Sequence, residues 1–201
     1  MSNNNIVYTN VPSGETGQKV VEYFTNKGGC LGKETISDEQ YEMMVATKVQ
    51  SSFNKEKALE VLGIDESQVQ EIPPICLHSY SYSIPVNGVQ ILSVQGKDKE
   101  WRSSAYQVTW IFFSDHEIYF YREIFCMDCN ASWAMTDEFF YEDVVNFYTT
   151  KETLWGEIKQ VAFSIVVPEE TKTVYLDMTE RNLAAIEGMK QKLREKKIKQ
   201  G

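Results

Sequence analysis

The sequence has few of the features that mark a secreted or membrane protein. Four cysteines in 201 residues are too few for a disulfide framework, so we expect a reducing, cytoplasmic setting. No apolar run approaches the roughly 20 residues that cross a bilayer. The first residues, MSNNNIVYTNVPSGETG, have neither the basic start nor the apolar stretch of a signal peptide. These absences argue against secretion and against membrane insertion.

Motifs of catalysis and of nucleotide binding are missing as well. The sequence has no Walker A loop, no G-x-G-x-x-G loop and no G-x-S-x-G around a serine. It has two histidines, and one of them, His116, is expected in a solvated turn. Glu138, Glu142 and Asp143 fall close together, as they would on a strand that faces water. We therefore expect a non-enzymatic protein with no catalytic residues, no cofactor and no bound metal.

Basic residues are outnumbered by acidic ones. The chain has 20 Lys and Arg against 29 Asp and Glu, which gives a net charge of -9. Such a surface repels phosphate backbones, so we expect no nucleic-acid partner. The hydrophobic content of 42% and the aromatic content of 12% are enough to fill a core, which excludes a disordered chain.

The first third of the chain is expected to be helical. We assign residues 1–14 to a flexible arm and residues 15–73 to a small helical domain. Helix stops, N-caps and capping boxes delimit its helices; these signals are Gly28-Gly29, Ser37 with Gln40, Asn54, Gly63 and Asp65. Pro73-Pro74 then ends the helical pattern, because proline lacks the backbone donor that a helix needs.

Residues 74–201 read as short strands followed by one helix. The alternation of side chains has a period of two from Ile75 onward. The stretch AYQVTWIFFSDHEIYFYREIFCMD, residues 105–128, predicts a central hairpin. We expect one further strand at Glu138–Thr149 and two at Lys159–Val167 and Lys172–Leu176. The fold class is therefore α+β.

The last helix is expected to begin at a capping box and to bury one seam. Asp177 and Glu180 have the spacing of the box, and the helix should run from Met178 to about Lys199. Its apolar seam consists of Leu183, Ile186, Met189 or Lys190, and Leu193.

Residues from about 80 to 198 resemble the bacterial PH-like (pleckstrin-homology-like, GRAM-like) domains. The resemblance rests on the hairpin YQVTWIFFSDHEIYFYREIF, on the strand FFYEDVVNFY, and on the ending VAFSIVVPEETKTVYLD with its capped helix. It implies a bent antiparallel β-barrel or sandwich capped by the C-terminal helix. The threonine–asparagine motif usual in the second strand of the family is replaced by Ser104-Ala105-Tyr106.

Cys126-Met127-Asp128-Cys129 is the sharpest local motif. A lone C-x-x-C pair can be a redox pair or half of a zinc site. Cys76 and His78 would complete a set of four ligands if their strand met the end of the hairpin. The competing explanation is that two small, half-buried residues end a strand, and we adopt it over both a zinc and a redox role.

Basic residues gather at the end of the chain and in one loop. The helix contributes Lys190, Lys192, Arg194, Lys196, Lys197 and Lys199, and the loop contributes Lys97, Lys99 and Arg102. These side chains can contact an anionic membrane surface, or the helix can dock on the acidic body of a second copy and form a homo-oligomer. A solvated helix end, favoured by the helix dipole, is the explanation of the tail that we prefer.

The leading hypothesis is a PH-like module that binds a protein or a peptide. Members of the family offer an open sheet edge or the groove beside the last helix, which suits addition of a strand. The expected edge is formed by the last strands, Lys159–Leu176. Peripheral membrane association through the basic tail and a zinc or redox role of the C-x-x-C pair are the alternatives.

Overall fold

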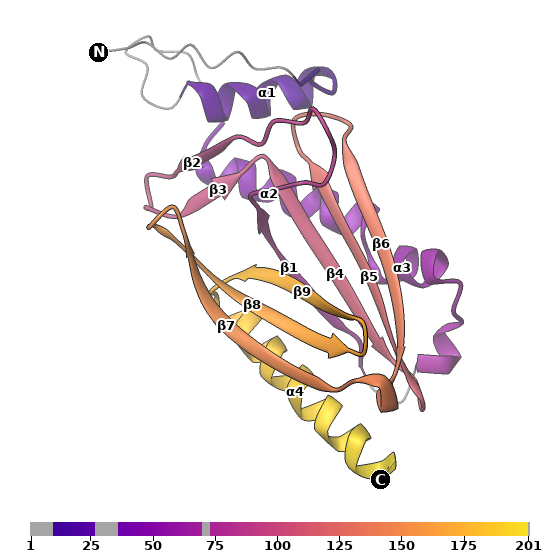
Figure 1. The fold of residues 1–201 in the computed structure, drawn as a ribbon. Coiled ribbons are helices and arrows are strands. Elements are labelled where there is room, and N and C mark those ends of the chain that lie inside the picture. Colours follow the sequence, from indigo (N-terminus) through magenta and orange to yellow (C-terminus); the bar gives the residue numbers. More distant parts are fainter. Residues whose placement is uncertain (1–9, 27–35, 70–72, 201) are drawn as a thin grey trace. The chain divides into compact units, whose positions relative to one another are not determined.

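The structure of the chain is a computed structural model that describes residues 10–26, 36–69 and 73–200 (Figure 1). The predicted arm therefore lies mostly outside the described residues, and so does the predicted stop at Gly28-Gly29. No helix within the described ranges has the length and apolar character that a membrane span requires.

The chain forms two compact units that interleave along the sequence. The first unit comprises Met1–Thr47, Ser81–Tyr106 and Ile124–Trp133. The second comprises Lys48–Tyr80, Gln107–Glu123 and Ala134–Gly201. Neither unit is a continuous segment on one side of Pro73-Pro74, so this division differs from the predicted pair of consecutive domains.

Capping residues predicted from the sequence begin α2 and bound α3. They are α1 (Gly14–Thr25), α2 (Asp38–Ser52), α3 (Lys55–Leu62) and the 3₁₀ turn η1 (Glu66–Val69). Before α2, Ser37 N donates to Gln40 Oε1 at 2.8 Å, and Gln40 N donates to Ser37 Oγ at 3.2 Å. At α3, Lys57 N donates to the Oδ1 atom of Asn54 at 2.9 Å, and the helix ends at Gly63. These hydrogen bonds confirm the predicted capping box and the predicted N-cap.

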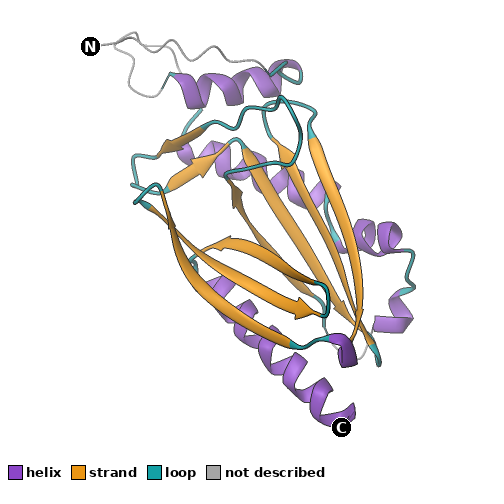
Figure 2. Cartoon of the chain, viewed as in Figure 1, coloured by secondary structure: helices purple, strands orange, loops and turns teal. Residues whose placement is uncertain are grey.

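The strands form three sheets (Figure 2). The first has the order β1-β4-β5-β6, with β1 at Ile75–Ser81, β4 at Ala105–Phe113, β5 at Glu117–Cys126 and β6 at Ser132–Phe140. The second pairs β2 (Ser93–Gln95) with β3 (Trp101–Ser103), and the third has the order β7-β8-β9, with strands at Asn146–Leu154, Ile158–Val167 and Glu170–Asp177. The α+β class is thus confirmed, and among the described residues the sheets remain separate and do not close into a barrel.

The predicted strand at Glu138–Thr149 is wrong because the chain changes sheets within it. β6 ends at Phe140, and a 3₁₀ turn, η2 (Tyr141–Asp143), precedes β7. Tyr141 holds this turn: its backbone N donates to His116 O at 3.0 Å, and its hydroxyl donates to Ser114 O at 3.1 Å. Arg102, expected in a loop with Lys97 and Lys99, lies instead in the short strand β3.

The last helix, α4 (Glu180–Gln200), starts two residues later than predicted. Its first turn is capped by Thr179, whose Oγ1 accepts from Asn182 N at 3.2 Å, so the assignment of the cap to Asp177 is wrong. Ile186, Met189 and Leu193 are buried as expected, whereas Leu183 is exposed. The buried seam joins the apolar core of the second unit, to which β7, β8 and β9 also contribute.

Candidate functional site

The turn between β5 and β6 brings three metal-ligating side chains together. The Sγ atoms of Cys126 and Cys129 and a carboxylate oxygen of Asp128 all lie within 4.8 Å of one another. All three residues are buried, with exposed fractions of 0%, 0% and 6% for Cys126, Asp128 and Cys129. The sequence pattern had singled out the cysteines but not Asp128, although the carboxylate stands between them. We call these three residues the Cys–Asp–Cys group.

The N-terminal part of the first unit holds Asp128 in place. Asn10 Nδ2 donates to Asp128 Oδ2 at 2.9 Å and to Gln90 O at 2.8 Å, and Asn10 Oδ1 accepts from Gln90 N. The backbone of Asp128 is held too, because its carbonyl oxygen accepts from Ser13 N at 2.8 Å. Gly17 lies so close to that carbonyl that a Cβ atom would come within 3.0 Å of it. Segment 10–17 therefore fixes both the carboxylate and the main chain of Asp128.

Cys76 and His78, the other predicted ligands, do not belong to the Cys–Asp–Cys group. Both lie on β1 within the second unit, where both are partly buried. Burial raises the pKa of the Cys76 thiol to about 11. Burial, together with the nearby Arg181, lowers the pKa of His78 to about 4. The fourth cysteine, Cys30, lies outside the described residues.

The loop expected to contact an anionic surface is the hairpin loop between β2 and β3, and its arginine is not exposed. Arg102 is only 2% exposed and forms ion pairs with Asp98, at 2.6 Å, and with Glu42. The hydrogen bonds from Arg102 lower the pKa of Asp98. Arg102 therefore neutralises carboxylates of its own unit, which does not fit the predicted surface contact. Of the three predicted contact residues, Lys97 and Lys99 lie on the loop itself.

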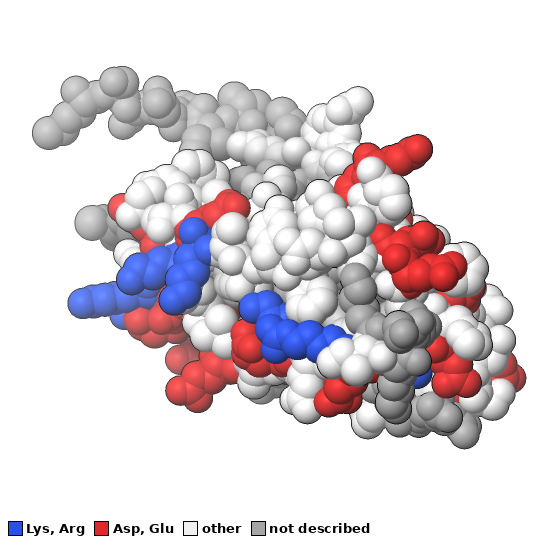
Figure 3. Space-filling view, turned by 60° about the horizontal axis from the view of Figure 1, so that its bottom comes forward, with Lys and Arg blue, Asp and Glu red and all other residues white. Residues whose placement is uncertain are grey.

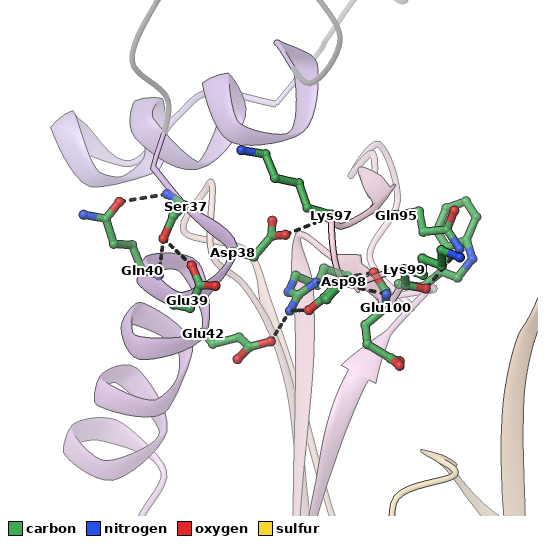
Figure 4. A network of polar contacts seen from close by, with 12 residues as sticks. Ser37, Asp38, Glu39, Gln40, Glu42, Gln95, Lys97, Asp98, Lys99 and Glu100 are labelled. Carbon is green, nitrogen blue, oxygen red and sulfur yellow. Dashed lines mark hydrogen bonds and ion pairs between the residues drawn. The ribbon is translucent and has the colours of Figure 1, made fainter.

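The same loop is tied to the start of α2 (Figure 4). Asp38, which is 8% exposed, accepts from Lys97 N at 2.8 Å and from the Tyr23 hydroxyl at 2.8 Å. Burial, reinforced by the bond to Asp38, raises the pKa of Tyr23. These contacts stay within the first unit and join α1, α2 and the loop, so we assign the network a structural role.

Most of the described basic side chains of α4 contact their own unit. Lys190 Nζ donates to Thr149 Oγ1 at 3.1 Å, and Lys192 Nζ donates to Pro73 O at 2.6 Å. Lys196 pairs with Asp115 at 3.5 Å and lies over the Tyr141 ring. The face drawn in Figure 3 likewise shows basic side chains lying beside acidic ones.

Among the remaining basic residues of the predicted tail, Arg194 is the one whose side chain the structure describes. Arg194 is exposed and lies over the Phe147 ring, at 5.8 Å from the ring centroid. The side chains of Lys197 and Lys199 lie outside the described set. The described cations of α4 are therefore already occupied, in part, by carbonyls, carboxylates and rings of the second unit.

The segment predicted to be the exposed edge, Lys159–Leu176, covers β8 and most of β9, and β9 is one of the two edge strands of β7-β8-β9. β8, which covers half of the predicted edge, is the central strand of β7-β8-β9. The outer side of β9 is met by polar side chains of other strands: Arg122 donates to Thr173 O at 3.1 Å, and Gln107 and Ser79 donate to Tyr175 O. Within the described part of the chain, β7 pairs with β8 alone.

Apolar side chains are exposed along and beside β7. Val145, Tyr148 and Trp155 have exposed fractions of 64%, 40% and 68%, and Phe140, at the end of β6, is 49% exposed. The predicted acidic residues nearby, Glu138, Glu142 and Asp143, are all exposed. A sheet edge with exposed apolar side chains is a surface to which another strand can add.

Comparisons with models of protein families, with curated proteins and with solved structures found no match to this chain.

Proposed function

We propose that the chain is a non-enzymatic binding module that accepts an extended peptide as an added strand on β7. The observation that carries the proposal is the position of β7 at an edge of β7-β8-β9, with Tyr148 exposed on the strand and Val145 and Trp155 exposed just before and just after it. The resemblance to PH-like domains supports the same role, since those domains offer a sheet edge to their partners.

The length and register of β7 suit strand addition. All nine of its residues pair with β8, from Asn146 opposite Val166 to Leu154 opposite Ile158. A strand held this firmly on one side presents the backbone groups of its other side in a regular row. Added main-chain hydrogen bonds would provide affinity, and the exposed side chain of Tyr148 would select an apolar residue at the position of the peptide beside it.

The other edge of the sheet provides the control. Tyr175 on β9 is 39% exposed, nearly the same as the 40% of Tyr148 on β7. The two tyrosines flank the same central strand, because Tyr148 lies opposite Ser164 and Tyr175 lies opposite Ala162. The backbone at Tyr175 is occupied, since its carbonyl accepts from the side chains of Gln107 and Ser79. Of the two edges of β7-β8-β9, only β7 is therefore expected to bind the peptide.

The test is selection of linear random peptides, displayed on phage, against the purified full chain. Selected peptides should slow amide hydrogen exchange in residues 146–154. Tyr148→Lys should weaken their binding by about 10-fold, and Tyr175→Lys should leave it unchanged. Enrichment of no peptide, protection that maps away from β7, or equal losses in the two variants would overturn the proposal.

A further inference from the structure

We infer that Cys126, Asp128 and Cys129 form a binding site for a divalent metal ion, with Zn²⁺ as the preferred ion. The inference goes beyond peptide binding and does not depend on it. It rests on the convergence of three ligand atoms within 4.8 Å at a buried turn, on their combined charge, and on the contacts that hold the turn.

The backbone of the turn is fixed at several points. Cys126 N donates to Ala131 O at 2.9 Å, which closes the turn between β5 and β6. Met127 N donates to Ser104 O at 2.8 Å, and Ser104 in turn exchanges hydrogen bonds with Leu92. Such bonds reduce the conformational freedom that three ligands would otherwise lose when a metal orders them.

The charges of the group favour a cation. When both thiols and the carboxylate are ionised, three negative groups lie within 4.8 Å of one another at a buried position. Like charges at such distances repel one another, and burial strengthens the repulsion. A divalent ion removes most of that repulsion, because it leaves a site charge of about -1 instead of -3.

The same electrostatics argue against a redox role for the pair. A reactive thiolate needs an electropositive environment that lowers its pKa. Within 4.8 Å of both sulfurs lies the acidic side chain of Asp128, which does not supply such an environment. The carboxylate is therefore better explained as a third ligand than as a neighbour of a redox pair.

The donor set fits zinc in both chemistry and size. Thiolate and carboxylate ligands bind Zn²⁺ tetrahedrally, with Zn–S distances of about 2.3 Å, so neighbouring sulfurs in such a site lie about 3.8 Å apart. The ligand atoms here lie within 4.8 Å of one another, so a contraction of at most about 1 Å would close the site. Three protein ligands leave one position for water or for another donor.

Asn10 acts as a positioning residue for the carboxylate. Its Nδ2 donates to Asp128 Oδ2 at 2.9 Å, and its amide is itself oriented by two hydrogen bonds to the backbone of Gln90. Hydrogen bonds of this kind orient a ligating carboxylate, and their loss typically costs about 10–100-fold in metal affinity. Because Asn10 bonds a ligand but supplies none, its effect can be separated from that of the ligands.

The experiment is titration of the full, reduced, metal-free chain with Zn²⁺ and with Co²⁺ under exclusion of oxygen. We expect binding of one ion per chain and a thiolate-to-cobalt charge-transfer absorption that Zn²⁺ displaces. Cys126→Ser, Asp128→Asn and Cys129→Ser should each weaken Zn²⁺ binding by more than about 10-fold, and Asn10→Ala by about 10-fold. Cys76→Ser removes a thiol outside the Cys–Asp–Cys group. This variant should bind Zn²⁺ as tightly as the unchanged chain does.

Several outcomes would overturn the inference. They are Zn²⁺ binding weaker than about 100 µM, a cobalt complex without thiolate absorption, and equal affinity in the Cys126→Ser and Cys76→Ser variants. Recovery of a Cys126–Cys129 disulfide that exchanges with a thiol reductant, in a chain that binds no Zn²⁺ when reduced, would favour a redox pair instead. Urea unfolding of each variant without metal separates loss of a ligand from loss of the fold.

Discussion

The absence of a side chain at Gly17 allows two segments that are far apart in the sequence to pack closely. A Cβ atom there would come within 3.0 Å of the Asp128 backbone oxygen and of Ser13 Oγ. The first of these neighbours is main chain, which cannot rotate out of the way. The close approach allows segment 10–17 to reach the turn that carries the Cys–Asp–Cys group.

Gly17→Ala should therefore destabilise the chain, although alanine is the better helix former. The gain in helix propensity is about 1 kcal/mol, and forcing extra atoms into a filled space costs about 1–3 kcal/mol. We expect a net loss of up to about 2 kcal/mol in the free energy of unfolding, measured in urea.

Gly188 in α4 is the matched control for this prediction. A Cβ atom at Gly188 would meet nothing within 4 Å, so Gly188→Ala should stabilise the chain by up to about 1 kcal/mol. Equal effects of the two substitutions would contradict the packing argument at Gly17.

Among the elements, α4 combines a buried seam with cations that contact the same unit. Lys190, Lys192 and Lys196 reach a hydroxyl, a carbonyl and a carboxylate of the second unit. Basic residues near an anionic bilayer contribute about 1 kcal/mol each only when they are available to the lipid. The net charge of -9 works against association as well.

We expect no measurable binding of the full chain to vesicles of phosphatidylserine and phosphatidylcholine at physiological salt. Any sedimentation at low salt should disappear as the salt is raised, because the attraction between exposed charges is screened. Vesicles of phosphatidylcholine alone are the control. Co-sedimentation that withstands physiological salt would revive the alternative of membrane association through the tail.

For the molecule as a whole, His78 links stability to pH. Burial and Arg181 lower the pKa of His78 to about 4, below its value of about 6.5 in an unfolded chain. Between these two values the unfolded state binds more protons than the folded state, so stability falls as the pH drops from about 6.5 to about 4. The shift sets an upper limit of about 3 kcal/mol on this contribution.

The prediction is that His78→Gln flattens the dependence of the unfolding free energy on pH in that window. His116→Gln, which removes an exposed histidine, should leave the dependence as it is in the unchanged chain. Urea unfolding at several pH values between about 4 and 7 measures both. If the unfolding free energy of His78→Gln varied with pH as it does in the unchanged chain, His78 would not be the cause of the loss of stability at low pH.

Features set by neighbouring residues were predictable from the sequence, and features set by distant ones were not. The caps at Ser37 and Asn54 were predicted correctly because donor and acceptor lie three residues apart. The break at Tyr141 was missed because apolar residues continue on both sides of it. Its cause is a contact with the β4–β5 hairpin, which no local pattern records.

The features of the candidate sites also divide into those visible in the sequence and those that depend on the fold. The spacing of Cys126 and Cys129 was visible, and so was Asp128 between them, but the burial of the carboxylate and its bond to Asn10 depend on the fold. The edge position of β7 was also hidden, because alternation along a strand does not give its place in a sheet. Burial of Arg102 against Asp98 and Glu42 could not be distinguished from exposure in a loop of mixed charge.

The hydrogen bond between Asn10 and Asp128 also has a consequence for the order of events during synthesis. Asn10 and Asp128 are 118 residues apart. At a translation rate of about 5–20 residues per second, the ribosome adds Asp128 roughly 6–24 s after Asn10. A new chain therefore spends that interval with its first helix made and its docking surface not yet made, so the nascent N-terminal segment must stay free of aggregation without its own partner.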